Sequence, residues 1–100
     1  MGTRLELHEE LLKFVPNVYF QPPTSMQIKY PCVIYAKSDK DVVYANDTKY
    51  RSIQLYDLTL IEQKPDTDIA DRIFTHFGYC DITQYYVADN LNHTKLNLYY

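Results

Sequence analysis

Four polar residues near the end of the chain, Asp89, Asn90, Asn92 and His93, are the nearest approach to a catalytic group in the sequence. An aspartate can orient an imidazole that acts as a general base. No activated nucleophile accompanies the pair, so a small hydrolase that uses His93 lacks its second component. Residues of these types also satisfy backbone hydrogen bonds where a chain reverses. We therefore predict that they form a turn between two strands and are not catalytic.

Metal and phosphate sites find little support. The histidines at positions 8, 76 and 93 are far apart and lack the short spacing of a metal site. Asp39 and Asp41 begin like a calcium loop, but Val43 occupies the third ligand position. The only glycines are Gly2 and Gly78, which excludes a glycine-rich phosphate loop.

Three aspartates, Asp66, Asp68 and Asp71, look like a carboxylate cluster. They fall where a helix is expected to begin, and negative charge is favourable at that end of the helix dipole. We interpret them as structural residues. The residue types therefore predict a protein that is not an enzyme and that uses no metal or cofactor.

Composition points to a different kind of function. The chain has 100 residues, which predicts one domain spanning 1–100, and 46% of them are hydrophobic. It contains 11 tyrosines and four phenylalanines without tryptophan. A domain of this size cannot bury so many rings, and tyrosine is well suited to protein interfaces. The surplus predicts a surface that contacts other proteins.

Charge and hydropathy restrict the partners. The net charge is −3, and the basic residues are scattered singly, so no basic stripe is present for nucleic acid. No apolar run approaches a membrane span, and the N-terminus lacks the apolar stretch of a signal peptide. We expect a protein made in the cytosol, with Cys32 and Cys80 as small buried residues that do not pair.

Two helices are expected. Thr3 and Glu6 form a capping box, and Pro16 prevents continuation, so the first helix is predicted from about residue 4 to 14. Its predicted buried positions are Leu5, Leu11, Leu12, Phe14 and Val15. A second helix is predicted after a cap at Asp66 or Thr67, with His76 in its last turn and Gly78 at its end. Its predicted buried positions are Ile69, Ile73, Phe74 and Phe77.

The remaining segments read as strands. A short strand is predicted at 17–20 and another after Pro31, and a long one follows in which Tyr56, Leu58 and Leu60 share one face while Ile53, Leu55 and Ile61 share the other. A C-terminal hairpin is predicted over 80–100. The fold class is therefore α+β, with two helices packed on a mainly antiparallel β-sheet.

The segment 37–49 is polar at both ends and apolar at Val42, Val43 and Tyr44. We predict a projecting hairpin or long loop here. A lone loop cannot bury such a run on both faces, and exposed apolar clusters tend to mark interfaces. These three residues are therefore the predicted protein interface, and an ordinary hairpin folded back on its own sheet is the alternative.

Several stretches taken together resemble the tail terminator, or tail completion, proteins of long-tailed bacteriophages and prophages of Gram-positive bacteria. They are "VYFQPP", "KYPCVIYA", "YDLTLIEQKPDTDI" and "YYVADNLNHTKLNLYY", and they span nearly the whole chain. The most specific elements are Tyr30-Pro31, Pro65-Asp66 and the run from Ala88 to His93.

The resemblance implies a small α+β subunit of a homohexameric ring, with no catalytic residues. Such a ring caps the tail tube protein, stops its polymerisation and meets the head-side connector or stopper, while DNA passes through the channel without specific binding. The implied location is the tail or neck of the virion, assembled in the host cytoplasm without a membrane. Two alternatives stay open: a head-completion or stopper protein of the neck, and a small tyrosine-rich protein-binding module.

Overall fold

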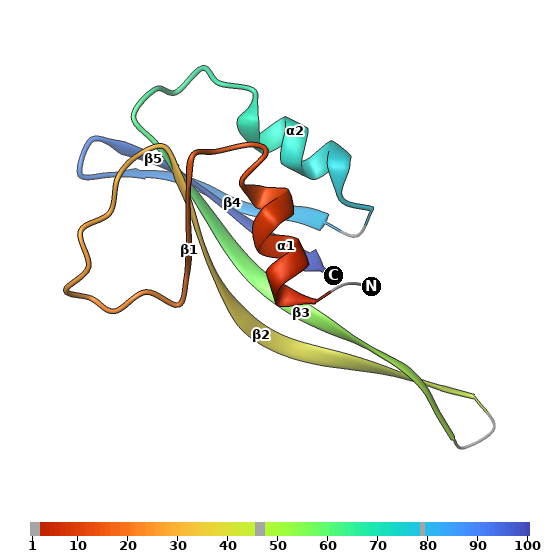
Figure 1. The fold of residues 1–100 in the computed structure, drawn as a ribbon. Coiled ribbons are helices and arrows are strands. Elements are labelled where there is room, and N and C mark those ends of the chain that lie inside the picture. The colour runs from red at the N-terminus through yellow and green to blue at the C-terminus, as the bar shows by residue number, and fades with distance from the viewer. Residues whose placement is uncertain (1–2, 46–47, 79) are drawn as a thin grey trace.

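The computed structural model describes the backbone of residues 3–45, 48–78 and 80–100, and the side chains of those ranges outside 39–53. Its elements in chain order are α1 (Arg4–Leu11), β1 (Asn17–Phe20), β2 (Cys32–Ala45), β3 (Thr48–Glu62), α2 (Ile69–His76), β4 (Cys80–Ala88) and β5 (Leu91–Tyr99) (Figure 1). Two helices and one mostly antiparallel sheet confirm the predicted α+β class.

The five strands form one sheet in the order β1-β2-β3-β5-β4. Three of the four pairings are antiparallel, including that of β4 with β5, which is the predicted C-terminal hairpin, and β1 runs parallel to β2. The connection from β1 to β2 contains the cis peptide bond Tyr30-Pro31. This order leaves β1 and β4 at the two edges of the sheet.

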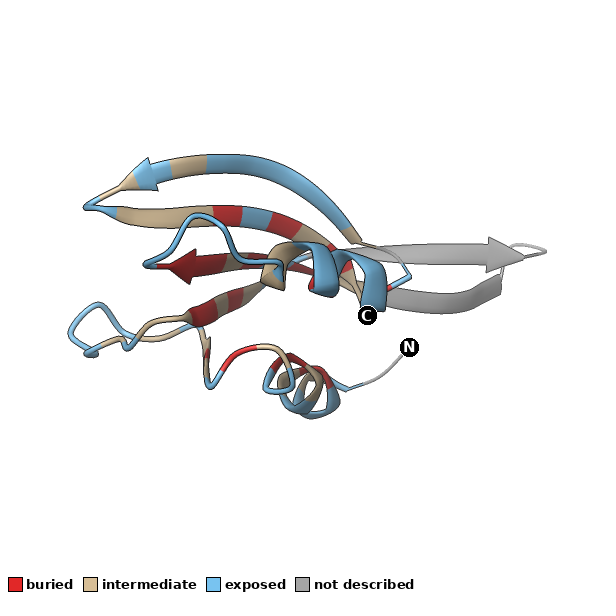
Figure 2. Cartoon of the chain, turned by 90° about the horizontal axis from the view of Figure 1, so that it is seen from above, coloured by how far each residue is buried: buried red, intermediate tan, exposed pale blue. Residues whose placement is uncertain are grey.

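Both helices cover the same face of the curved sheet (Figure 2). Because side chains alternate along a strand, one set of β3 residues faces the helices, and these are Tyr56, Leu58 and Leu60, as predicted. Ile61 on the other face is also buried, Leu55 is half-buried, and the side chain of Ile53 lies outside those described. The core on the helix face is made of Leu7, Leu11, Val15, Val18, Val33, Tyr35, Tyr56, Leu58, Leu60, Ile73, Phe77, Leu96 and Leu98.

The first helix begins as predicted but is shorter. The Thr3 hydroxyl accepts a hydrogen bond from the Glu6 amide at 3.2 Å, which is the expected cap. The helix ends at Leu11, and the amides of Phe14 and Val15 bond back to the Leu11 carbonyl in separate turns. The prediction of a helix to residue 14 therefore included these turns.

The predicted buried face of α1 was partly wrong. Leu11 and Val15 are buried, but Leu5 is 65% exposed and Leu12 is 45% exposed. Leu7 takes the place of Leu5, because residues four apart lie on one side of a helix and Leu7 and Leu11 have that spacing. Leu12, one residue further on, is rotated by about 100° away from the sheet.

The second helix also differs from its prediction in detail. Its N-cap is Asp68 and not Asp66 or Thr67, and the Thr67 hydroxyl donates to the buried Glu62 carboxylate instead. Ile73 and Phe77, four residues apart, are buried. Phe74 was predicted to be buried and is 45% exposed, since it follows Ile73 around the helix. Ile69 is half-buried against the core.

A long hairpin projects from the sheet, and it is the most extended part of the molecule (Figure 1). The pairing of β2 with β1 ends at Tyr35, and the pairing of β3 with β5 begins at Leu55. Between these points no other strand pairs with β2 or β3, although the Tyr100 amide donates to the Gln54 carbonyl at 3.1 Å at the base of the segment. We call this two-stranded segment, residues 36–54, the arm. Of the two predicted forms of segment 37–49, a projecting hairpin or a long loop, the structure has the hairpin.

Candidate interaction surfaces

The polar turn near the C-terminus is a two-residue hairpin loop. Asp89 and Asn90 connect β4 to β5, with φ angles of 54° and 61°. Two consecutive residues in the left-handed region define the type I′ turn whose twist matches that of paired strands, and Asp and Asn accept that conformation more readily than most residues. The predicted turn is confirmed for this pair, whereas Asn92 and His93 lie in β5.

His93 makes local contacts that hold its ring against the sheet. Its ring stacks on Tyr86 of β4, with the centroids 4.6 Å apart and an interplanar angle of 8°. Its Nδ1 lies 3.1 Å from the Leu91 carbonyl oxygen, so that nitrogen carries the proton and donates it. No hydrogen bond or ion pair joins His93 to Asp89, and both of these side chains are described. The structure therefore does not assemble the Asp–His pair.

Asn92 serves the sheet as well. Its side-chain oxygen accepts a hydrogen bond from the Tyr85 hydroxyl at 2.9 Å, and its amide nitrogen donates to the Glu62 carbonyl at 3.4 Å. These bonds connect β5 to both of its neighbours, β4 and β3. The polar residues that suggested a catalytic site thus form the turn or make hydrogen bonds between strands.

The three histidines lie in three separate places. His8 contacts the Tyr35 hydroxyl, His76 contacts Glu10, and His93 contacts Tyr86. Within the described part of the chain, no group of three or more His, Cys, Asp or Glu residues could hold a metal ion. The side chains of Asp39 and Asp41 lie outside those described.

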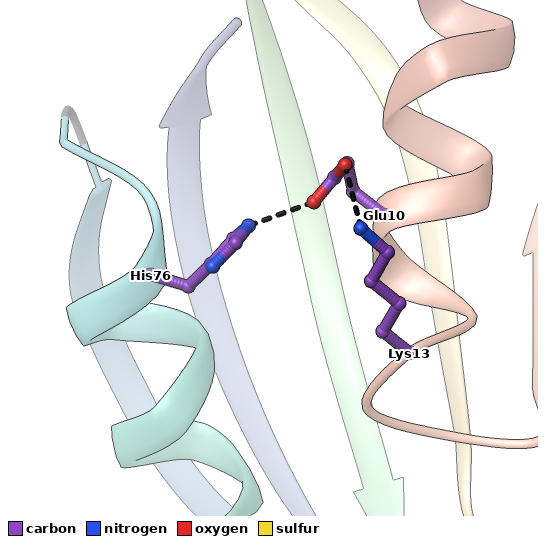
Figure 3. Close-up of polar contacts among 3 residues, drawn as sticks. All are labelled: Glu10, Lys13 and His76. Carbon is purple, nitrogen blue, oxygen red and sulfur yellow. Dashed lines mark hydrogen bonds and ion pairs between the residues drawn. The ribbon is translucent and has the colours of Figure 1, made fainter.

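Figure 3 shows the polar contact that joins the two helices. The Glu10 carboxylate on α1 lies 2.8 Å from His76 Nε2 on α2 and 3.0 Å from Lys13 Nζ. Hydrogen bonds from Lys13 and then His76 lower the pKa of the Glu10 carboxyl. The sequence predicted the place of His76 in the last turn of its helix but not this partner, because 66 residues separate it from Glu10.

An open depression of about 460 Å³ lies beside this contact. Its lining combines aromatic rings with charges of both signs and is formed by Phe14, Asp68, Asp71, Arg72, Thr75 and His76. Arg72 lies over the Phe14 ring, 5.6 Å from its centroid. The basic group near the aspartates is therefore held by a local cation–π contact.

Both cysteines are free thiols. Cys32 is buried and Cys80 is half-buried, in partial agreement with the prediction that both are buried. Burial raises the pKa of each thiol to about 11, so at neutral pH neither is the thiolate that a nucleophilic cysteine requires.

The predicted interface residues Val42, Val43 and Tyr44 lie in the β2 strand of the arm. Their backbones pair with β3, at Ser52, Arg51 and Lys49. Their side chains lie outside those described. The structure thus places the predicted segment on a hairpin that extends beyond the five-stranded part of the sheet.

The edge strand β4 carries an apolar stripe that sequence reasoning missed. A bulge lies between Ile82 and Gln84, where Thr83 is the extra residue. Directly paired residues share a face of the sheet, so Ile82 lies with Leu96 and Tyr85 with Thr94 on the helix-covered face. Val87 continues this row two residues later. Because the bulge interrupts the period of two, the sequence of β4 does not show these residues as one face of a strand.

These side chains nevertheless lie outside the helix cover. Ile82 is 43% exposed, Tyr85 is 56% exposed and Val87 is 63% exposed, and Figure 2 shows most of β4 as exposed. Among the described residues, no strand pairs with the outer edge of β4. The edge therefore combines unpaired backbone groups with a row of exposed apolar side chains.

Neither a protein-family model nor a curated protein sequence matches the chain. Within the described residues, no helix has both the length and the apolar character needed to cross a membrane.

Proposed function

We propose that this chain is a structural protein of a bacteriophage virion, a tail terminator that closes into a ring of six on the end of the tail tube. The observation that carries the proposal is the arm, in which β2 and β3 leave the sheet as a two-stranded ribbon. An isolated two-stranded hairpin is marginally stable in water, so a segment of this kind is expected to be supported by another molecule.

A ring explains how the same chain can provide both sides of such a contact. When a projecting element of one copy meets a different surface on the next copy, the contact is head-to-tail and generates a ring if the rotation closes. The exposed apolar stripe on β4 offers such a second surface. The copy number of six comes from the resemblance to tail terminators.

The architecture also favours this function over its neighbours in the virion. A stopper protein of the usual kind is a β-barrel with little helix, whereas this chain has an open sheet with two helices on one face. A monomeric tyrosine-rich binding module is the alternative from another class, and a particle-bound copy number of one would favour it.

The ring would meet the tail tube protein on one side and the head-side connector on the other, within the tail or neck of a virion assembled in the host cytoplasm. DNA would pass through its channel without specific binding. The net charge of −3 supports that part of the proposal, since an acidic wall does not attract phosphates.

Deletion of the gene from the producing phage or prophage tests the proposal. Tails should then grow beyond their fixed length and fail to join heads, and a plasmid copy of the gene should restore both properties. Tails of normal length that join heads in the deletion strain would contradict a terminator. A particle-bound copy number other than six, measured by mass or by microscopy of the tail end, would contradict the ring.

A further inference from the structure

The outer edge of β4 has the features of a strand-docking site. β4 pairs with β5 on one side only, so part of its backbone N–H and C=O groups face outward. Sheet edges that must stay free usually carry lysine or proline, and the sequence of β4, "CDITQYYVA", contains neither. Its bulge and Asp81 are the only protective features of the strand.

The exposed stripe adds side-chain contacts to this edge. Ile82, Tyr85 and Val87 all face the helix side of the sheet, where a strand added beyond β4 would place its own inward row. Backbone hydrogen bonds would supply affinity, and the apolar row would fix the register. The chemistry of the edge therefore selects an extended strand as its occupant.

We propose that the β4 edge receives the arm of a neighbouring copy of this chain, an inference that rests on the proposed ring. The arm is the one described segment in which both strands have outer edges without a third strand. It contains ten residues of β2 (36–45) and seven of β3 (48–54), so the β2 side is long enough to pair along the nine residues of β4. Because it projects away from its own sheet, it is placed to reach another molecule (Figure 1).

Two further observations favour the arm over other strands. The opposite sheet edge, β1, has only four residues and is followed by Gln21 with a φ of 44°, so it offers a short partner. A twofold pairing of β4 with β4 would close after two copies and build no ring.

Charge is complementary as well. Segment 36–54 contains four basic and three acidic residues, a net charge of +1, which leaves −4 for the rest of the chain. Two exposed aspartates flank this edge: Asp81 lies near the start of β4, and Asp89 follows its last residue. A basic arm would therefore be attracted to this edge and orient along it.

Photo-crosslinking in the producing cell tests the contact with every natural partner present. Tyr85 is replaced by p-benzoyl-phenylalanine, a ring of related shape on an exposed position, and folding is checked by circular dichroism of the purified variant. Illumination should give a product of two copies of this chain, and mass spectrometry should place the junction within segment 36–54. The same substitution at Phe74, an exposed ring on α2, is the matched control and should give no arm junction.

The outcomes separate this inference from the function. A junction with β4 of a second copy, with another protein, or the absence of any product would overturn the arm–edge contact. If the arm junction forms but gene deletion leaves tails normal, the contact stands and the terminator function fails. If deletion gives overgrown tails without the junction, the function stands and the contact fails.

A charge variant provides a second readout. Val87→Lys places a charge on the stripe at a position that is 63% exposed, so the melting temperature should stay unchanged while ring formation on tails is lost. Leu12→Lys, at an exposed leucine that caps the end of α1, is the control and should leave ring formation intact. Rings that form normally with Val87→Lys would overturn the proposal.

Discussion

The Tyr35 hydroxyl lies 2.8 Å from Nδ1 of His8, and this contact fastens α1 to the second strand of the sheet. Arg4 donates to the same hydroxyl at 3.3 Å and lies over the Phe20 ring, 4.3 Å from its centroid. Since the hydroxyl accepts from Arg4, it can donate its own hydrogen bond to His8 Nδ1, which requires that nitrogen of the imidazole to be unprotonated. Tyr35 itself is fully buried, so the bond satisfies a polar group inside the core.

This contact predicts a pH-dependent stability. Burial, and then the charge of Arg4, lower the pKa of His8 below its ordinary 6.5. The unfolded chain therefore takes up the proton first as the pH falls. Stability is constant above about pH 6.5 and decreases as the pH falls through the folded pKa of His8. The melting temperature of the parent should drop more between pH 7.5 and pH 5 than that of His8→Gln. Equal drops would contradict the prediction.

The helix-to-helix contact also predicts a loss of stability on acidification, at a lower pH than the loss from His8. Because the pKa of Glu10 is lowered below its ordinary 4.5, its bonds to Lys13 and His76 stabilise the fold above that pH and are lost as the pH falls through the folded pKa. Glu10→Gln should melt slightly below the parent at pH 7, and this difference in melting temperature should shrink as the pH falls below 4.5. The effect is small because the group is exposed. Glu9→Gln removes the same charge without these bonds and should leave a smaller gap.

The helix face that the structure corrected gives a direct stability test. Leu11 is fully buried, and Leu11→Ala should cost about 2 to 5 kcal/mol of unfolding free energy through lost burial and the cavity left behind. Leu12 is 45% exposed, and Leu12→Ala should stay within about 0.5 kcal/mol. Denaturant unfolding measures both. A larger loss of unfolding free energy for Leu12→Ala than for Leu11→Ala would show that Leu12 is on the buried face, as the sequence predicted.

The arm prediction is tested by a charge at Val43. If the side chain contacts another protein, Val43→Asp should leave the isolated domain folded with a normal melting temperature and abolish the capping of tails. If it packs on its own hairpin, the same charge should destabilise the isolated protein. A variant that caps tails as well as the parent would contradict a contact at this position.

Local patterns explain why much of the fold could be predicted. The alternation of Tyr56, Leu58 and Leu60 indicates a strand with one buried face, and Thr3 with Glu6 indicates where a helix begins. The face of α1 was harder to predict, because the leucines at 5, 7 and 11 of this eight-residue helix and Leu12 at its C-cap point to several sides. Only the position of the sheet decides which of them are buried.

The interaction surfaces depend on contacts that no local pattern contains. The bond from His8 to Tyr35 spans 27 residues, and the order of strands that leaves β4 at an edge follows from β5 pairing with β3. Strict alternation would place Ile82 and Tyr85 on opposite faces, and the bulge at Thr83 brings them onto the same face. Tertiary pairing therefore created the stripe, and the tyrosine content alone indicated that such a surface should exist.

The turn at Asp89 and Asn90 yields the last prediction. Asn90 has a φ of 61°, a left-handed conformation that the Cβ of alanine makes sterically unfavourable and that glycine adopts without this cost. Asn90→Ala should therefore lower stability by about 1 kcal/mol, while Asn90→Gly should match or exceed the parent, as measured by denaturant unfolding.

The matched variant in the neighbouring strand is His93→Gln, which removes the titrating imidazole and keeps a hydrogen-bonding side chain of comparable reach. Because His93 stacks on Tyr86 and donates to the Leu91 carbonyl, we expect modest destabilisation and intact tail assembly. If the folded His93→Gln protein failed to assemble while Asn90→Gly assembled normally, the imidazole would have a role in binding or chemistry beyond the hairpin. If these residues serve only to form the hairpin, both variants should assemble normally, because Asn90→Gly keeps the backbone conformation of the turn and the imidazole of His93 has no further task.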